Sequence, residues 1–244
     1  MENQFQRTEL LLGEQAMARL KQARVAVFGL GGVGGFVAEG LVRAGVGALD
    51  LVDNDTISLS NLNRQILALH STLGCLKTKV AAQRVKDINP DCAVTTHNCF
   101  YLPDTASLFD FAQYDYIVDA VDTVSAKLAL VENAAKAATP IICCMGTGNQ
   151  LDASAFEIAD IFQTANDPLA RVMRKELKKR GIRSLKVLYS KQKPVRPDAQ
   201  KLSAVMQAEI PADSSKRDIP GSVSFVPSVA GLMIAGEVVK DLLH

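Results

Sequence analysis

Residues 24–35 of the chain read RVAVFGLGGVGG, in which a short β-branched run passes directly into a glycine-rich stretch. The run at 24–28 predicts a buried strand, and the apolar segment at 36–44 predicts a helix that ends at Gly45. Glycines between a strand and a helix allow a tight turn and a close approach of the backbone to a phosphate, whose charge the free N–H groups of the helix attract. The stretch therefore predicts a nucleotide-binding turn with four candidate ligand-binding positions: Gly29, Gly31, Gly32 and Gly34.

Segments typical of strands and of helices alternate around this turn. Helices of this length between strands are typical of right-handed crossovers and of a mostly parallel sheet covered on both faces. The predicted fold class is therefore α/β, a Rossmann-like doubly wound sheet with C-terminal strands and a terminal helix. The elements expected before residue 150 are helices at 8–21, 77–88 and 125–138 and strands at 50–53, 93–96, 116–119 and 140–144.

The alternation of expected strands and helices changes after residue 150. We expect a single domain, residues 1–244, with two parts. Residues 1–149 are expected to bind the nucleotide, and residues 150–244 to meet the substrate and a second subunit. The segment at 191–218 has little periodicity and several prolines, so we expect a partly mobile surface loop there. The other expected elements are strands at 152–158, 185–190 and 222–226 and helices at 168–180 and 227–243.

Composition restricts the function. The 244 residues are 48% hydrophobic and carry 27 basic against 26 acidic side chains, so bulk charge does not hold the protein on nucleic acid, and we expect no DNA partner. No apolar stretch reaches the roughly 18 residues of a membrane span. Five cysteines without a CxxC pair argue against a disulfide scaffold or a four-cysteine zinc site, so we expect a cytoplasmic protein with no membrane partner.

Charged residues follow the predicted strands where a nucleotide would bind. Asp53 comes 19 residues after Gly34, where a carboxylate can accept hydrogen bonds from a ribose. A nicotinamide ring needs a flat apolar pocket, but the segment after Asp53 is polar, so ATP is the better prediction. Arg64 and Lys77 can supply cations for a triphosphate, and Asp122 can supply a carboxylate for Mg²⁺. A nicotinamide-dependent oxidoreductase and a non-catalytic nucleotide-binding module remain as alternatives.

Four motifs in the first 150 residues resemble the ThiF/MoeB/HesA family of adenylating enzymes, which are related to ubiquitin-activating enzymes. They are GLGGVGG at 29–35, LVDNDTISLSNLNRQ at 51–65, GCLKTK at 74–79 and DAVDT at 119–123. The resemblance implies that Asp53 holds the ribose, that Arg64 and Lys77 hold the phosphates, and that Asp122 supports Mg²⁺. It also implies that the polar segment after Asp53 contributes cofactor-binding residues, namely Asp55, Asn61, Asn63 and Gln65.

The opening sequence QRTEL, at 6–10, carries a further implication of this resemblance. Arg7 resembles the arginine with which family members reach into the ATP site of the neighbouring subunit, which implies a homodimer. Arg7 is therefore a candidate catalytic residue together with Arg64, Lys77 and Asp122. Family members adenylate a carboxylate, whose oxygen attacks the α-phosphate of ATP while pyrophosphate leaves.

The second half of the chain distinguishes the branches of this family. Sulfur-carrier activators commonly have two CxxC pairs for zinc and a cysteine in the crossover region, and neither is found in this sequence. The segments at 146–152, 167–171 and 220–227 instead resemble the tRNA threonylcarbamoyladenosine dehydratase branch. That resemblance implies ATP-dependent ring closure of threonylcarbamoyladenosine in tRNA, in which a substrate nitrogen expels AMP and no enzyme cysteine acts. A sulfur-carrier-protein adenylyltransferase of MoeB/ThiF type remains the nearest alternative, and a cysteine desulfurase or sulfur-acceptor system is a further candidate partner.

An independent feature favours an RNA substrate. Residues 171–186 contain eight basic side chains and a single acid, Glu176. Phosphate contacts supply most of the non-specific affinity for nucleic acid, so this stretch is a candidate tRNA-binding patch, with a solvated helix face as the alternative. Its members in the expected helix are Arg171, Arg174, Lys175, Lys178 and Lys179.

Two groups of residues are expected to have no chemical role. Cys143 and Cys144 lie in a predicted buried strand, where packing is the better interpretation. The histidines are scattered and lack a metal-ligand spacing or a carboxylate partner: His70, His97 and His244.

Overall fold

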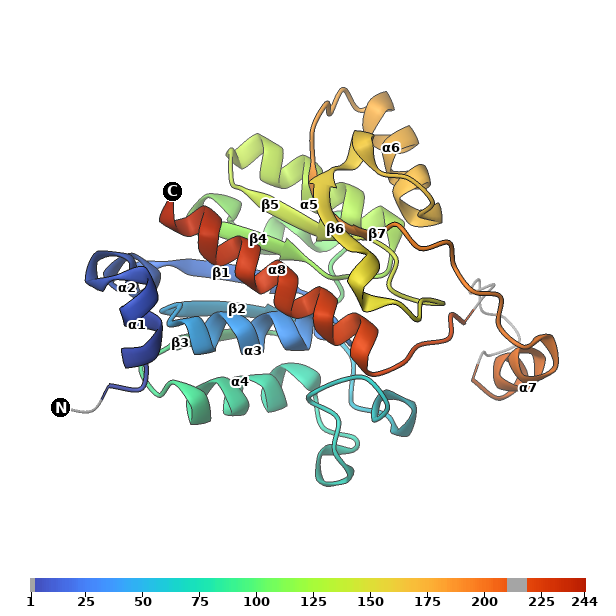
Figure 1. The fold of residues 1–244 in the computed structure, drawn as a ribbon, viewed down its shortest axis with the longest axis horizontal. Helices are drawn as coiled ribbons and strands as arrows, with labels where there is room; N and C mark the ends of the chain where they lie inside the picture. Colours follow the sequence, from blue (N-terminus) through green and yellow to red (C-terminus); the bar gives the residue numbers. More distant parts are fainter. Residues whose placement is uncertain (1–2, 210–218) are drawn as a thin grey trace.

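The computed structural model of the chain describes residues 3–209 and 219–244, which form one seven-stranded sheet with helices on both faces (Figure 1). The strand order is β3-β2-β1-β4-β5-β7-β6. The strands are β1 (Arg24–Phe28), β2 (Ala48–Val52), β3 (Ala93–His97), β4 (Tyr116–Asp119), β5 (Ile141–Cys144), β6 (Phe156–Asp160) and β7 (Lys186–Ser190). The helices are α1 (Gln6–Leu12), α2 (Glu14–Gln22), α3 (Gly34–Ala44), α4 (Lys77–Ile88), α5 (Val124–Ala137), α6 (Pro168–Lys179), α7 (Ala199–Glu209) and α8 (Phe225–Leu243). The predicted α/β, doubly wound fold is confirmed.

All neighbouring strands are parallel except β6 and β7, and β1 lies inside the sheet between β2 and β4. Residues Val25 to Phe28 of β1 are fully buried, because β2 and β4 flank the strand and helices cover both faces. The chain builds β2 and β3 on one side of β1 and then continues with β4 and β5 on the other. Such a reversal opens a crevice at the carboxyl ends of the strands, which is where ligands of doubly wound sheets bind.

Two helical layers cover the sheet. Helices α3, α4 and α8 lie over one face, with α5 and α6 on the other (Figure 1). Helices α3 and α8 approach closely because glycines lie at their contact: a Cβ on Gly40 would come within 2.6 Å of the Ala235 Cβ, and one on Gly231 within 2.5 Å of the Val33 carbonyl oxygen. This contact fixes α8 over the turn that begins α3.

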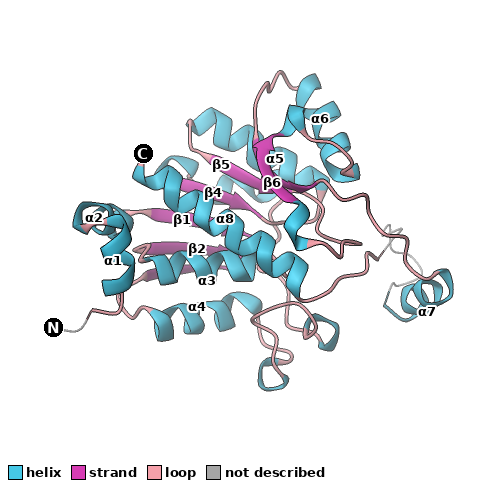
Figure 2. Cartoon of the chain, viewed as in Figure 1, coloured by secondary structure: helices cyan, strands magenta, loops and turns pink. Residues whose placement is uncertain are grey.

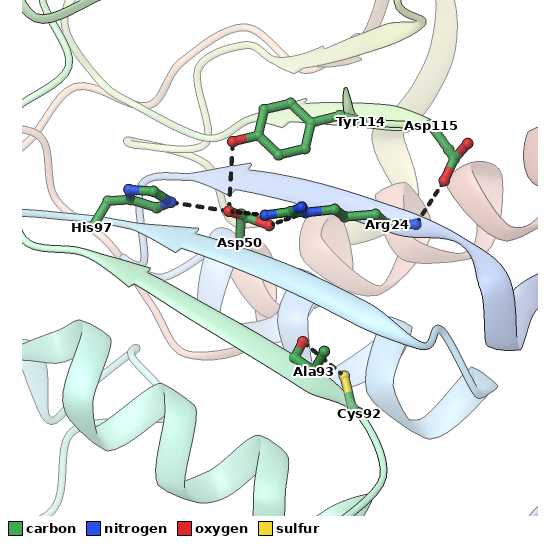
Figure 3. A network of polar contacts seen from close by, with 7 residues as sticks. All are labelled: Arg24, Asp50, Cys92, Ala93, His97, Tyr114 and Asp115. Atoms are coloured by element: carbon green, nitrogen blue, oxygen red, sulfur yellow. Dashed lines mark hydrogen bonds and ion pairs between the residues drawn. The ribbon is translucent and has the colours of Figure 1, made fainter. Parts of the chain in front are cut away.

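A buried polar network joins the first three strands (Figure 3). The Asp50 carboxylate in β2 accepts hydrogen bonds from Arg24 Nε at 2.7 Å and Arg24 Nη2 at 3.1 Å, and lies 2.9 Å from His97 Nε2. Burial and the Asp50 charge raise the pKa of the nearby Tyr114 to about 12. The expectation that His97 has no carboxylate partner is therefore wrong, because strand pairing brings together residues 47 positions apart in the chain.

The expected single helix at 8–21 is wrong, since the chain forms α1 and α2 instead. Gly13 separates them with φ of +82°, a left-handed backbone conformation that a continuous helix does not contain. None of the α1 residues is buried, so packing does not hold the two segments in one line. The periodicity of the leucines is real, but the glycine decides where each helix ends.

The region after β7 also differs from the expectation. Residues 199–209 of the expected loop form α7, which stands away from the sheet (Figure 2), and Asp198 Oδ1 accepts hydrogen bonds from Gln200 N and Lys201 N at its start. Residues 210–218 lie outside the described part of the chain. The expected strand at 222–226 is wrong because α8 already begins at Phe225, and Pro227 lies in its first turn, a helix position that tolerates proline.

Candidate nucleotide-binding site

A cleft of about 800 Å³ lies at the carboxyl ends of β1, β2, β4 and β5. Its lining includes segments from both halves of the chain, the glycine turn and the segment after β2 on one side and residues 144–150 and 167–169 on the other. The location agrees with the crevice that the strand order creates. A large concave site with converging polar groups is the best candidate for ligand binding in the described part of the chain.

The glycine turn between β1 and α3 is shaped by close backbone contacts. Gly29 has φ of +87°, and a Cβ on it would lie 2.7 Å from the Ala120 carbonyl oxygen. A Cβ on Gly34 would overlap the Gly29 carbonyl oxygen at 1.7 Å. Gly31 and Gly32 line the cleft together with Gly29, whereas Gly34 is a buried residue of α3 that does not line it. Gly34 therefore permits the turn, and the other three glycines present their backbone to a ligand.

Asp53, directly after β2, is hydrogen-bonded to that turn. Its Oδ2 accepts a hydrogen bond from Leu30 N at 2.7 Å, and its Oδ1 accepts one from Asp55 N at 2.8 Å. Lys77 Nζ lies 2.7 Å from Asp55 Oδ2 and 3.8 Å from Asp53 Oδ1, and the lysine side chain is 6% exposed. Two carboxylates thus balance the buried ammonium group, and phosphate oxygens that enter the cleft can replace part of that balance.

The polar segment between β2 and α4 forms a compact loop. Asn61 closes its first turn, since its Oδ1 accepts a hydrogen bond from Ser58 N at 3.2 Å. Arg64 Nη1 donates to Ser60 O at 2.7 Å and to Asn63 Oδ1 at 2.9 Å, which fixes the guanidinium at the cleft wall. Asn63 does not line the cleft and instead donates to Ser222 O at 3.0 Å. The loop therefore positions Arg64 and also connects the two halves of the chain.

Gln65 and Asp122 complete the lining on this side. Gln65 is buried, and within the described residues its Oε1 has no hydrogen-bond partner, which leaves an acceptor for a donor on a ligand. Asp122 follows β4 and is exposed in the cleft, where its Oδ1 accepts a hydrogen bond from Thr123 Oγ1 at 3.2 Å. The structure thus brings Asp53, Lys77, Arg64 and Asp122 to one cleft.

Sequence reasoning missed a charged pair beneath the cleft. The side chains of Asp119 and Lys127 are fully buried and 3.1 Å apart, and Lys127 Nζ also donates to Cys144 O at 2.7 Å. Burial alone would lower the pKa of Lys127, but attraction to Asp119 outweighs it and the pKa is raised. The pair ties the carboxyl ends of β4 and β5 together. Asp119 is the first residue of the DAVDT motif, so the motif contained a signal that was read only at Asp122.

Asp167 is the second residue that sequence reasoning missed. It caps α6 by accepting a hydrogen bond from Ala170 N at 2.9 Å, and its Oδ2 accepts one from Gly146 N at 3.1 Å. The residue is 3% exposed and lines the cleft. The signal was present, because an aspartate directly before a proline that begins a helix is typical of an N-cap.

Two cysteines line the cleft. Burial raises the pKa of Cys144 to about 12 and also raises the pKa of Cys99, and both residues line the cleft. Cys143 is fully buried, and burial raises its pKa well above the ordinary value. The expectation that Cys143 and Cys144 are buried is confirmed.

Arg7 and the basic stretch lie outside the cleft lining. Arg7 belongs to α1, which packs with α2 near the amino end of β1 (Figure 1), so the fold of one chain does not bring it to the cleft. In α6, Arg171, Lys175 and Lys178 are exposed. The other two candidates make contacts within the protein. Arg174 Nη1 lies 3.0 Å from Thr164 O, and Lys179, which is also exposed, has its Nζ 2.6 Å from Glu176 Oε1.

The fold and the site together define a nucleotide-binding protein, because a glycine turn, a carboxylate fastened to it and two cations surround one cleft at the switch point of the sheet. The chain belongs to the ThiF family, whose model matches residues 4–244. It is 42% identical to the tRNA threonylcarbamoyladenosine dehydratase of Bacillus subtilis, over 100% of this chain and 96% of that protein. It is 32% identical to the protein of the same name from Escherichia coli, over 98% and 93% of the two chains.

The fold agrees with a solved structure. The crystal structure of the E. coli tRNA N6-threonylcarbamoyladenosine dehydratase TcdA in complex with ATP superposes with a TM-score of 0.86 at 30% identity, over 98% of this chain and 93% of that chain. Similarity over nearly the full length includes the second half of the chain, where the branches of the family differ.

Proposed function

We propose that this protein is an ATP-dependent tRNA threonylcarbamoyladenosine dehydratase that activates the substrate carboxylate by adenylation and then closes a ring. The observation that carries the proposal is the cleft itself, in which Asp53, Lys77, Arg64 and Asp122 surround the glycine turn. The full-length identity of 42% to a protein of that name supports the choice of substrate. ATP is a substrate here, and the complex of TcdA with ATP supports its place in the reaction.

In the adenylation step, an oxygen of the substrate carboxylate attacks the α-phosphorus of ATP and pyrophosphate leaves. The cleft assists mainly through position and charge. Asp53 accepts hydrogen bonds from the ribose, the backbone of Gly31 and Gly32 lies against the phosphates, and Lys77 with Arg64 balances the charge of the leaving group. Lys77 is already desolvated, so its charge acts strongly on a phosphate.

Asp122 would hold Mg²⁺ against the phosphates. Within the described residues, no three histidine, cysteine or acidic side chains come together as a metal site. One exposed carboxylate beside a phosphate site nevertheless fits magnesium, which takes one or two carboxylates and completes its octahedron with phosphate oxygens and water. Bound there, the ion would neutralise charge on the phosphates.

The ring-closing step needs no nucleophile from the enzyme. Three atoms separate the substrate nitrogen attached to the adenine ring from the activated carbon, so its attack on that carbon closes a five-membered ring and expels AMP. The cleft cysteines agree, because burial raises the pKa of both Cys99 and Cys144, and thiols with a raised pKa are poor nucleophiles that do not suit a thioester-forming activator. The proposed reaction itself transfers no sulfur, and a cysteine desulfurase or sulfur-acceptor system stays a candidate partner only.

The exposed face of α6 is the proposed contact for the tRNA backbone. Arg171, Lys175 and Lys178 follow helical spacing and lie on one face. The helix begins at Pro168 and Leu169, which line the cleft, so the patch starts beside the proposed reaction site. A tRNA held there could place its modified base in the cleft.

We also propose a homodimer in which Arg7 of one chain serves the cleft of the other. The support is the surface of α1, where Leu10 and Leu11 are 82% and 87% exposed and Leu12 is exposed as well. Among the described residues, no helix has the length and apolar character needed to cross a bilayer. Because tRNA is the proposed substrate, we assign the protein to the cytoplasm.

Incubation with tRNA that carries threonylcarbamoyladenosine, ATP and Mg²⁺ tests the proposal. The expected products are AMP, pyrophosphate and a nucleoside lighter by one water, measured by mass spectrometry of the digested tRNA. Absence of both AMP and the lighter nucleoside contradicts the proposal. Pyrophosphate exchange that depends instead on a small protein ending in Gly-Gly would indicate a sulfur-carrier adenylyltransferase.

A further inference from the structure

The cleft has a second side that the adenylation step does not use. The strands at its floor follow the order β2, β1, β4, β5. At a spacing of about 4.8 Å per strand, the ends of β2 and β5 lie roughly 14 Å apart. In an acyl adenylate, the phosphate lies between the ribose and the acyl carbon. With its ribose at Asp53 and its phosphate at the glycine turn, its acyl end points toward β5.

Ring closure at that end releases a proton. A role for this proton rests on the proposed function. A bond forms between the substrate nitrogen and the acyl carbon, and the bond from that carbon to the AMP oxygen breaks. AMP leaves with the bonding electron pair. The hydrogen on the attacking nitrogen must therefore pass as a proton to a base close to the acyl end.

Among the described residues that line the cleft on the β5 side, Cys144 and Asp167 are the groups that can change protonation. Burial raises the pKa of Cys144 to about 12, so it is a neutral thiol and a poor proton acceptor. The carboxylates elsewhere have other partners: Asp53 and Asp55 balance Lys77, and Asp122 lies on the phosphate side of the cleft. Asp167 remains as the acceptor beside the acyl end.

The surroundings of Asp167 suit this task. Its carboxylate accepts backbone hydrogen bonds from Ala170 N, Gly146 N and Leu169 N, which leaves a lone pair for a further donor. The charge of Lys127, from α5, lowers the pKa of Asp167 without a hydrogen bond between them, and Lys127 forms its ion pair with Asp119. The titratable group that faces it from β5 is Cys144. Burial raises the pKa of Asp167, which makes this carboxylate a stronger base than an exposed aspartate.

We propose that the Asp167 carboxylate accepts the proton from the substrate nitrogen during ring closure. Its backbone hydrogen bonds hold it at the start of α6, beside the turn at Gly146. After the cyclic product leaves, the carboxyl group returns the proton to solvent. Asp167 is then a catalytic residue of the second step and takes no part in the first.

The experiment separates the two steps in the Asp167→Asn variant. Asparagine keeps the size of the side chain, and its Oδ1 can still cap α6. It cannot accept the proton, and its amide NH2 also loses the hydrogen bond from Gly146 N. ATP–pyrophosphate exchange in the presence of modified tRNA reports adenylation, and the lighter nucleoside reports ring closure. Asp152→Asn is the matched control, because Asp152 also caps a helical turn, accepting a hydrogen bond from Ser154 N at 2.9 Å, and lies outside the cleft lining.

We expect exchange by Asp167→Asn within about twofold of the wild type and ring closure slower by roughly 10²- to 10⁴-fold, the range for removal of a general base. Water then competes for the adenylate, so more than one AMP is released per cyclised nucleoside. If Asp167→Asn does not fold, Asp167→Ser, which also keeps the cap, is the second variant. It is expected to show the same result, exchange near the wild-type rate with slow ring closure. In single turnovers, wild-type ring closure is expected to slow as the pH falls through a pKa above that of ordinary aspartate.

Ring closure at the wild-type rate in Asp167→Asn would overturn the proposal. An equal loss of exchange and ring closure would overturn it as well, because Asp167 would then only shape the cleft. Failure of the proposed function gives a different result, since the wild type would then release neither AMP nor the lighter nucleoside.

Discussion

The two sides of the cleft are built differently. The nucleotide side comes from the glycine turn, Asp53 and Lys77, which lie within residues 29–77 and are held to one another by a hydrogen bond and an ion pair. The β5 side is assembled from distant segments held mainly by backbone hydrogen bonds, such as Asn149 N to Gly221 O at 2.8 Å and Val195 N to Asn149 O at 2.7 Å. The nucleotide side is therefore a local unit of the chain, whereas the β5 side depends on the packing of distant segments.

The largest expected effect comes from removal of the buried cation on the nucleotide side. Lys77→Ala leaves Asp53 and Asp55 without their counter-charge and removes a contact to the phosphates. We expect ATP–pyrophosphate exchange to fall by about 10³-fold or more, in the range found when a preorganised charge contact is lost. Lys79→Ala, an exposed residue of the same helix, is the control and should keep its exchange rate. A Lys77→Ala enzyme with normal exchange would contradict the account of this side.

The second prediction concerns the pair that joins both sides. Lys127→Met leaves Asp119 as a buried, unpaired carboxylate, which should lower the free energy of unfolding by about 3–5 kcal/mol in chemical denaturation. The double variant with Asp119→Leu removes both charges and should recover much of that loss. Lys136→Met, on an exposed position of α5, is the control. If the double variant were no more stable than Lys127→Met, the pair would not act as a unit.

The sequence predicts some parts of this molecule and not others. The glycine turn, the strands around it and Asp53, Lys77 and Asp122 were predictable because their signals are local and lie at strand ends. The division of the first helix at Gly13 depended on one backbone conformation, and α7 depended on the cap at Asp198. Asp167 was missed as a cleft residue because its place beside Gly146 results from the packing of α6 against β5, which no local pattern specifies.

A smaller effect is expected from the basic face of α6. Reversal of charge in Lys175→Glu with Lys178→Glu should raise the Kd for tRNA by about tenfold at low salt and leave the Kd for ATP unchanged, because phosphate contacts act without the nucleotide site. The same double variant should show a shallower dependence of tRNA affinity on salt. Lys21→Glu with Lys136→Glu, both on exposed positions outside α6, gives the control for net charge. An unchanged Kd for tRNA would show that α6 is only a solvated face.

The smallest expected effect concerns a backbone contact on the β5 side of the cleft. A Cβ on Gly148 would lie 2.5 Å from the Pro220 Cβ, so Gly148→Ala should displace the contact between these segments. We expect a rise of a few fold, about 1 kcal/mol, in the KM for tRNA with little change in the KM for ATP. Gly236→Ala is the control, since its Cβ would meet no atom within 4 Å. A change in the KM for ATP alone would reverse the assignment of the two sides.

The central claim is that the substrate carboxylate is activated by attack on the α-phosphorus of ATP. The most direct measurement uses modified tRNA whose threonyl carboxylate carries ¹⁸O, with mass spectrometry of the released nucleotide. The account predicts one ¹⁸O in AMP, because the attacking oxygen stays on phosphorus when the nitrogen closes the ring. Release of ADP with ¹⁸O in inorganic phosphate would contradict it.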